Sequence, residues 1–291
     1  MDQGDSRQRT ALHIPAPQDA APHNDSLRQA VVMAGAVLGL AGAFIGSGAA
    51  GGTPMPEVSG GALAADATLI APGGPAFAIW TPIYAGLMAY AVWQLLPKQR
   101  TDARQRRLGY PLALSLLLNA AWILSVQFDL LALSVPIIAA LLVVLVWVLR
   151  IMRETRPKNR VELGLVDVTM GLYLGWVCVA TAANVAAVLV AAGFTGFGVS
   201  PDIWGVAVIV VAGLVGVGLA IYDRGRFAPS IALCWGLGWV ASARLTGDLV
   251  STPTAITAIL AGVAVFAVTA VARLHARTGA AAAPRGSGVA A

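Results

Sequence analysis

The feature that most constrains the fold is the alternation of long, almost uncharged apolar stretches with short runs of arginine and lysine. Eight stretches approach the roughly 20 apolar residues that a helix needs to cross a bilayer. They cover residues 30–50, 76–96, 110–128, 131–150, 165–191, 204–222, 230–245 and 255–274. Charged residues make up only 11% of the chain, against about a quarter in a soluble domain. We therefore predict an all-α fold, a polytopic transmembrane helix bundle in contact with the lipid bilayer.

Positive residues cluster in alternate loops. Lys and Arg occur between the second and third, the fourth and fifth, and the sixth and seventh stretches, and again after the eighth. The intervening loops contain none, apart from Arg244 just before residues 246–254. Because cytoplasmic loops carry the excess of positive residues, we expect a protein of the cell membrane with both termini in the cytoplasm and an even number of spans. The stretch at 230–245 is short, but removing it would place the C-terminal arginines outside.

The polar ends and the overall charge limit the possible partners. Residues 1–29 and 276–291 are predicted to be disordered tails, the first of them cytoplasmic. The net charge of +5 lies in runs between apolar stretches, so no basic surface for nucleic acid is expected. The two cysteines, Cys178 and Cys234, lie inside apolar stretches and supply neither a disulfide framework nor a zinc spacing. No metal site is expected.

Ionisable side chains inside spans usually mark function, and here they are scarce. Both lysines lie in loops, and His13, His23 and His275 lie in tails or at a span end. A buried haem ligated by histidine and a histidine-based hydrolase triad are therefore not expected. Asp129 and Asp167 are interpreted as interfacial carboxylates, because neither falls at mid-depth. We predict no catalytic residue and no enzyme, short of photochemistry by tryptophan.

Two further features leave alternatives open. The first stretch carries Gly35-xxx-Gly39 and Gly42-xxx-Gly46, which let another helix approach closely. Packing inside the bundle is the favoured interpretation, and a homodimer is the alternative. The outer loop at 51–75 is long and rich in Gly, Ala and Pro. Such a loop is either a functional cover or a loose connector.

Aromatic and amide residues share helix faces on three of the predicted spans. Spacings of three or four place side chains on one face of a helix. The residues at these spacings are Trp80 and Tyr84 on the second span, Asn119 and Trp122 on the third, and Tyr173, Trp176, Ala180 and Asn184 on the fifth. Asparagines in spans commonly hydrogen-bond to another helix, which is one interpretation of both amides. If the three faces meet, they form an apolar pocket with a few hydrogen-bonding groups, the usual form of a small-molecule site.

These motifs resemble the tryptophan-rich sensory protein, or translocator protein, family (TspO/MBR). The segment from Pro75 to Tyr84 resembles its second-helix signature, Leu118-Asn119-Ala120-Ala121-Trp122 its Leu-Asn-x-x-Trp, and Tyr173 to Asn184 its Tyr-x-x-Trp-x-x-x-Ala-x-x-x-Asn. The resemblance covers residues 30–192, a predicted five-helix core, and leaves residues 193–275 as three additional transmembrane helices. Two departures are Leu172, where the family has proline, and a Phe-to-Trp spacing on the second helix that is one residue short.

The resemblance implies a function and a ligand. Members of that family bind tetrapyrroles such as protoporphyrin IX and haem, sterols, and synthetic aromatic ligands. It implies that the eight residues named above line a pocket beneath the 51–75 loop, with no cofactor required beyond a porphyrin or haem as ligand. The implied function is a membrane sensor or regulator for an apolar, planar small molecule. A multi-pass transporter of a hydrophobic metabolite is the alternative, and porphyrin photochemistry at Trp80 and Trp176 is the third.

Overall fold

The computed structural model describes residues 24–48, 51, 53–54 and 57–282. Within these residues the chain is helical and contains no strand, as predicted. Its eight long helices are α1 (Asp25–Gly46), α2 (Trp80–Trp93), α4 (Ala103–Gln127), α5 (Leu131–Glu154), α7 (Thr169–Ala191), α8 (Pro201–Tyr222), α9 (Phe227–Thr246) and α10 (Thr252–Ala282). The short elements are the 3-10 turns η1 (Val58–Gly61), η2 (Gly74–Ile79) and η4 (Gly196–Gly198), the short helices α3 (Pro97–Arg100) and α6 (Arg160–Glu162), and the π-helical η3 (Leu163–Val168).

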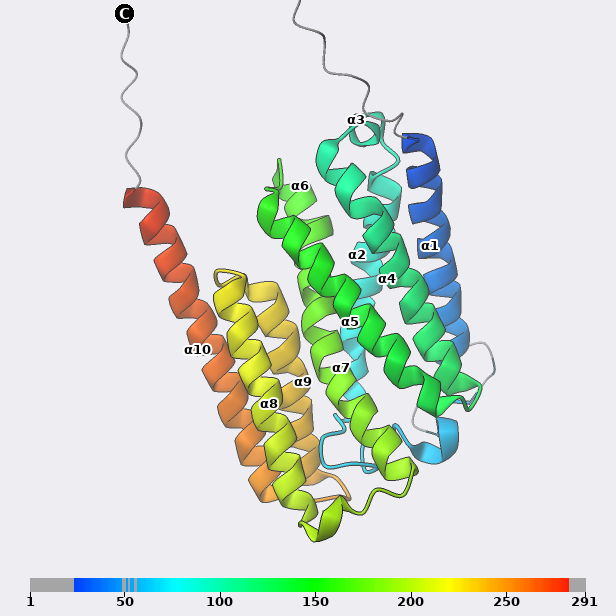
Figure 1. Cartoon of the computed structure of the whole chain (residues 1–291), viewed down its shortest axis with the longest axis vertical. Helices are drawn as coiled ribbons and strands as arrows, with labels where there is room; N and C mark the ends of the chain where they lie inside the picture. Colours follow the sequence, from blue (N-terminus) through cyan, green and yellow to red (C-terminus); the bar gives the residue numbers. More distant parts are fainter. Residues whose placement is uncertain (1–23, 49–50, 52, 55–56, 283–291) are drawn as a thin grey trace, which may run out of the picture.

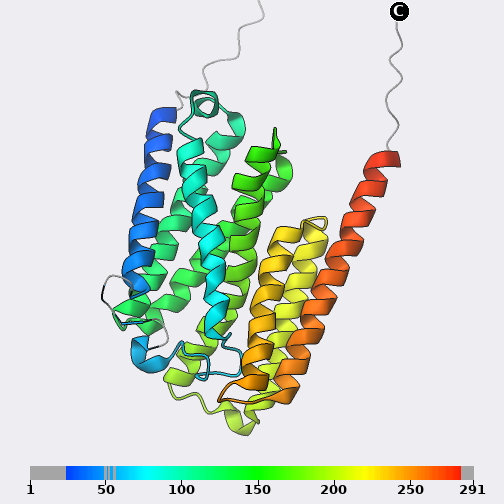
Figure 2. The same ribbon diagram turned by 180° about the vertical axis from the view of Figure 1, so that it is seen from behind.

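The long helices run roughly side by side and alternate in direction (Figure 1). Helix α1 begins, and helix α10 ends, toward the same end of the molecule. The views from both sides show α8, α9 and α10 as a group beside α7, with α1, α2, α4 and α5 on its other side (Figures 1 and 2). We call α1, α2, α4, α5 and α7 the five-helix part, and α8 to α10 the three-helix part.

Seven helical segments of the described chain are long and apolar enough to cross a membrane. The eighth predicted span, residues 230–245, corresponds to α9, which is not among the seven. Helix α9 is 20 residues long but carries Arg244. One face of α9 packs closely on α7, since a Cβ at Gly236 would meet Val179 of α7 at 2.9 Å, while Ile231 and Trp235 on another face are 49% and 39% exposed.

Helix α1 begins five residues earlier than the sequence predicted, so the tail prediction is wrong for residues 25–29. The Asn24 side chain caps the helix by accepting a hydrogen bond from the Leu27 backbone N–H at 3.1 Å. Asp25 pairs with Arg106 at 2.6 Å, and buried Arg28 donates to two carbonyls before α4 at 3.0 and 3.2 Å. These polar contacts continue the helix outside its apolar stretch.

The other predicted tail also starts too early. Helix α10 continues to Ala282, so residues 276–282 are helical rather than disordered. The remaining predicted tail residues, 1–23 and 283–291, lie outside the described residues.

The arginine-rich end of the molecule is joined by buried ion pairs. Arg104 in the first turn of α4 contacts Glu162 at 2.9 Å and Asp167 at 2.8 Å, and all three side chains are buried. Arg226, just before α9, contacts the other oxygen of Asp167 at 3.1 Å. Asp167 therefore lies near a helix end with arginines as partners, in agreement with its interpretation as an interfacial carboxylate, and it links the two parts of the molecule.

The glycine stripe of α1 packs against α4. A Cβ at Gly35 would lie 3.3 Å from the Ala113 carbonyl oxygen, and one at Gly42 would lie 2.8 Å from the Ala120 Cβ. The stripe therefore lets two helices of the same chain approach closely, and the bundle-packing interpretation is confirmed. A homodimer stays a prediction, and this stripe is not available to form it.

Candidate ligand-binding site

An aromatic cluster joins the start of α2 to the first turns of α7. A proline-led 3-10 turn, η2, carries Phe77, and α2 follows at once with Trp80. Trp80 stacks on Tyr84 with ring centroids 5.0 Å apart, and its edge meets Tyr173 at 5.8 Å and Trp176 at 6.3 Å. Phe77 meets Trp176 edge-on at 5.7 Å. Two of the three predicted faces therefore come together through ring contacts.

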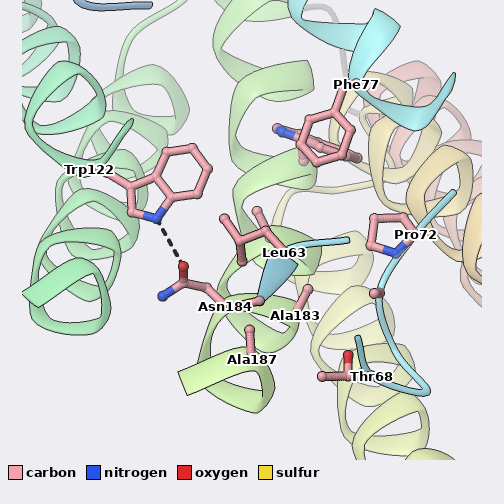
Figure 3. A pocket seen from close by; sticks show the side chains of 12 residues that line it. Leu63, Thr68, Pro72, Phe77, Trp122, Ala183, Asn184 and Ala187 are labelled. Carbon is pink, nitrogen blue, oxygen red and sulfur yellow. Dashed lines mark hydrogen bonds between the residues drawn. The ribbon is translucent and has the colours of Figure 1, made fainter. Parts of the chain in front are cut away.

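Hydrogen bonds bring the third face, on α4, into the same site. Asn119 donates from Nδ2 to the Tyr84 hydroxyl at 2.7 Å, and the Tyr173 hydroxyl donates to the Ser115 carbonyl at 3.1 Å. Trp122 donates from Nε1 to the Asn184 Oδ1 at 3.2 Å, as Figure 3 shows. Both asparagines thus bond between helices, and that interpretation is confirmed.

A narrow cavity of about 40 Å³ lies between α4, α7 and the long outer loop. Four predicted site residues line it: Trp122, Trp176, Ala180 and Asn184. The remaining lining residues are Ala62, Leu63, Thr68, Ala71, Pro72, Phe77, Ala183 and Ala187. Figure 3 shows Leu63 of the loop in the space bordered by Trp122 and Phe77. The described part of the 51–75 loop, which we call the cover, therefore lies over this cavity. Residues 52 and 55–56 of the loop lie outside the described residues.

A wider groove of about 480 Å³ lies on the other side of Phe77 and Trp122, against α1. Trp80 and Tyr84 line this groove, together with Leu40, Ala43, Phe44, Ser47, Pro54, Gly74 and Ile123. Phe44 and Leu40 are 56% and 42% exposed, so the groove opens on the lipid-facing side of α1. Phe77 and Trp122 line both spaces and form the wall between them.

The structure thus divides the predicted site rather than placing all eight residues around one pocket. Asn119 and Tyr173 line neither space; both are fully buried behind the aromatic walls and serve as hydrogen-bonding partners. Phe77 was not among the predicted residues, although it precedes Trp80 by three and so shares its helix face. That spacing would have identified it.

Two polar groups that border the narrow cavity have no partner. The Trp176 Nε1 and the Thr68 Oγ1 are buried and lack a hydrogen-bond partner among the described residues. Nearly all buried polar groups in proteins are paired, so each orphan calls for an explanation such as a bound water or a ligand. A ligand in this cavity could accept a hydrogen bond from the indole and exchange one with the hydroxyl.

The three-helix part holds the cover in place through α9. Buried Arg244 donates to the carbonyl oxygen of Thr68 at 3.0 Å and to that of Ala65. Farther along the loop, the Gly73 N–H donates to the Trp239 carbonyl at 3.2 Å. Figure 2 shows this loop reaching across to the lower part of α9. Sequence reasoning missed this role of Arg244, although its isolation at an otherwise uncharged end was a signal.

The match to a known protein family covers helices of both parts of the molecule. Residues 32–272 match the family model described as TSPO-like protein. The matched segment runs from α1 into α10, so the C-terminal helices lie within it rather than outside the family. The boundary at residue 192 stays a prediction. No curated protein and no solved structure matches the chain.

Proposed function

Because the chain belongs to the TSPO-like protein family and is a multi-pass membrane protein, we propose that it binds an apolar, planar small molecule, such as a porphyrin or a sterol, as a membrane sensor or regulator. The observation that carries this proposal is the aromatic wall of Phe77, Trp80, Tyr84 and Trp122 along a groove of about 480 Å³. This volume falls within the roughly 300–1,000 Å³ usual for ligand pockets. The activity proposed is binding, with no catalytic residue.

The groove suits a ligand that is dissolved in the membrane. Its described lining residues carry no charge, and its outer edge is formed by exposed apolar residues of α1. A planar ring system entering from the lipid would meet the Trp80–Tyr84 stack and gain offset or edge-on ring contacts, each worth about 0.5–1.5 kcal/mol beyond area burial. Burial of apolar surface alone would favour sterols as well.

The narrow cavity would hold only part of such a ligand. Its volume of about 40 Å³ is far below that of a usual ligand pocket. For a tetrapyrrole to extend from the groove toward Trp176, the Phe77 ring and Leu63 of the cover would have to move. An acceptor group on the ligand would then satisfy the orphan indole N–H of Trp176.

We also propose that the arginine-rich end faces the cytoplasm. This end carries the Arg104, Arg106, Arg153 and Arg226 side chains, whereas the opposite loops contain no Lys or Arg apart from Arg244 in the last turn of α9. The excess of positive residues marks cytoplasmic loops. A C-terminal fluorescent-protein fusion that matures only in the cytoplasm should therefore be bright.

The binding proposal is tested by titrating protoporphyrin IX into the purified protein and following the quenching of tryptophan fluorescence. Trp80→Leu should raise the Kd about three- to tenfold, because it removes one stacking surface. Trp122→Leu should weaken binding as well, since its ring separates the two spaces. Trp147→Leu is the matched control, because Trp147 is 51% exposed on α5 and lines neither space.

Thermal unfolding of each variant establishes that it is folded before its affinity is compared. Saturable binding with the same Kd in wild type, Trp80→Leu and Trp122→Leu would show that the ligand sits elsewhere. Absence of saturable binding of porphyrin and of a sterol probe would reject the proposed ligand class.

A further inference from the structure

A third space, of about 550 Å³, lies on the three-helix side of the cover loop. It is bordered by the last turns of α7, with Leu189 and Val190, and by the first turns of α8, with Trp204 and Val208. The loops that connect α7 to α8 and α9 to α10 close its end, and residues 67–70 of the cover form one wall. Thr68 is the only residue that this cavity shares with the narrow cavity among their described linings. The two are therefore separate spaces on opposite sides of one loop.

The lining of this cavity is apolar and partly aromatic. Phe194 meets Trp204 edge-on, with ring centroids 5.6 Å apart. Trp204 is held by its own hydrogen bond, in which Nε1 donates to the Gly196 carbonyl at 3.1 Å. The aromatic wall is thus fixed to the loop between α7 and α8. The volume of this cavity, like that of the groove, is in the range of ligand pockets.

Asp202 distinguishes this cavity from the site of the proposed function. It is the one charged residue among the described residues of the lining, and its Oδ1 accepts a hydrogen bond from the Ser251 hydroxyl at 2.6 Å. The ion pairs found in the described part of the chain do not include Asp202. The narrow cavity and the groove have no charged residue in the part of their linings that the structure describes.

In the loops at this end of the molecule, carboxylates outnumber cations. The loops at this end carry the acidic residues Glu57, Asp66, Asp129 and Asp248. Arg244 is the cation in this region, and two of its guanidinium nitrogens donate to carbonyls of the cover. An excess of carboxylates favours a cationic partner, because complementary charge raises both encounter rate and specificity.

We propose that this cavity binds a cationic amphiphile, a molecule with an apolar or aromatic body and a protonated amine. The body would lie between α7 and α8 against Trp204 and Phe194. The ammonium group would lie beside Asp202, where it can donate a charge-assisted hydrogen bond to the carboxylate. Aromatic rings nearby add a favourable environment for a cation. This proposal does not depend on the proposed porphyrin site and would stand even if the protein did not bind porphyrin.

The test compares two probes that share a body and differ in the head group. They are 2-(1-naphthyl)ethylamine, protonated at neutral pH, and 2-(1-naphthyl)ethanol. Binding to the purified full-length protein in detergent micelles is measured by equilibrium dialysis against protein-free micelles. We expect the amine to bind about tenfold more tightly than the alcohol. Asp202→Asn should remove that preference, because a hydrogen bond to a charged group is lost.

Asp248→Asn is the matched control, because it removes the same charge two residues from lining residue Val250 but lies exposed outside the cavity. Its amine affinity should change by less than about twofold, as expected for an exposed, screened charge. Ala186→Phe, which would fill the space from α7, should abolish binding of both probes. Leu189→Trp fills the same wall from a position that is 44% exposed and serves if the first variant does not fold.

Equal binding of amine and alcohol, or an amine preference that persists in Asp202→Asn, would overturn the proposal. So would binding that is unchanged in both cavity-filling variants. A phospholipid that co-purifies in the cavity and is displaced equally by both probes would assign the space to lipid and overturn the proposal too.

Discussion

The five-helix part and the three-helix part both pack helices through glycine, but among the described residues the five-helix part has more hydrogen bonds from buried side chains to other helices. In the five-helix part, buried polar side chains bond across helices: Gln29 donates to the Gln94 carbonyl at 2.6 Å, and the Tyr90 hydroxyl donates to Gln105 at 3.0 Å. In the three-helix part, the Ser230 and Thr269 hydroxyls are 2.6 Å apart, and small residues let the backbones approach as they do between α1 and α4: a Cβ at Gly213 would lie 2.9 Å from that of Ala261. Neither device needs water, which suits helices in lipid.

The difference bears on where a ligand can fit. The three spaces described above all border the five-helix part or the cover loop, and the third also borders the first turns of α8. Large aromatic and amide side chains line the narrow cavity and the groove. The three-helix part therefore acts as a packed scaffold that holds the cover through Arg244 and Trp239.

The largest expected effect comes from breaking a polar contact in the five-helix part. Arg104→Ala would leave Glu162 and Asp167 buried without this cation, which costs about 3–5 kcal/mol. The measurement is unfolding of the purified protein in mixed micelles. Arg107→Ala is the control, because its pair with Glu154 is exposed and worth less than about 1 kcal/mol. Similar losses for the two variants would contradict the view that buried polar contacts hold this part together.

The second largest effect is expected from a substitution that disturbs the close packing between the two parts. An alanine Cβ at Gly175 of α7 would overlap the carbonyl oxygen of Pro229 in α9 and lie 3.0 Å from its Cα. Gly175→Ala should therefore destabilise the protein by about 1–3 kcal/mol. At Gly238, exposed on α9, a Cβ meets nothing within 4 Å. Gly238→Ala should be neutral or stabilising by up to about 1 kcal/mol, and equal effects of both changes would reject this interface.

A smaller effect is expected at the cover. Arg244→Met removes the guanidinium bonds to the Thr68 and Ala65 carbonyls while keeping much of the side-chain volume. The loop should open locally about tenfold more often, which hydrogen exchange of the amides at 62–73 would report. Arg224→Met, at an exposed position of the same part, is the control. Unchanged exchange in Arg244→Met would mean that the cover is held by its other contacts.

The smallest effect depends on pH. Burial raises the pKa of the Asp223 carboxyl to about 7, although Arg226 and Arg153 lower it. The folded state therefore binds this proton more tightly than the unfolded state, and stability falls as pH rises from about 4, the unfolded pKa, through 7. Asp223→Asn should remove that loss and raise the unfolding midpoint at pH 8 by roughly 3 °C, with little change at pH 4.

Asp248→Asn is the control for that series, because Asp248 is exposed in the loop between α9 and α10. A wild-type stability that is flat between pH 4 and 8, or the same pH slope in Asp223→Asn, would contradict the assignment to this carboxyl.

Much of this organisation was predictable from local sequence signals. Span length, the alternation of arginine between loops and the three- or four-residue spacings of Trp80, Asn119 and Trp176 depend only on helix geometry and on lipid as solvent. The Asn24 cap that starts α1 early is also a local signal, because asparagine favours that position. These features act within one or two helical turns, so the sequence determined the helical membrane fold, the glycine packing face and the helices that contribute to the site.

Only the tertiary structure decided how the site is divided into separate spaces and which long-range contacts hold its cover. Phe77 separates two spaces because the turn at η2 places its ring against Trp176, almost 100 residues away in sequence. Arg244 meets the cover, and Arg226 meets Asp167, across separations of 176 and 59 residues. Such contacts depend on which helices become neighbours in the bundle. That choice follows from the packing of complete helix faces, which no local spacing encodes.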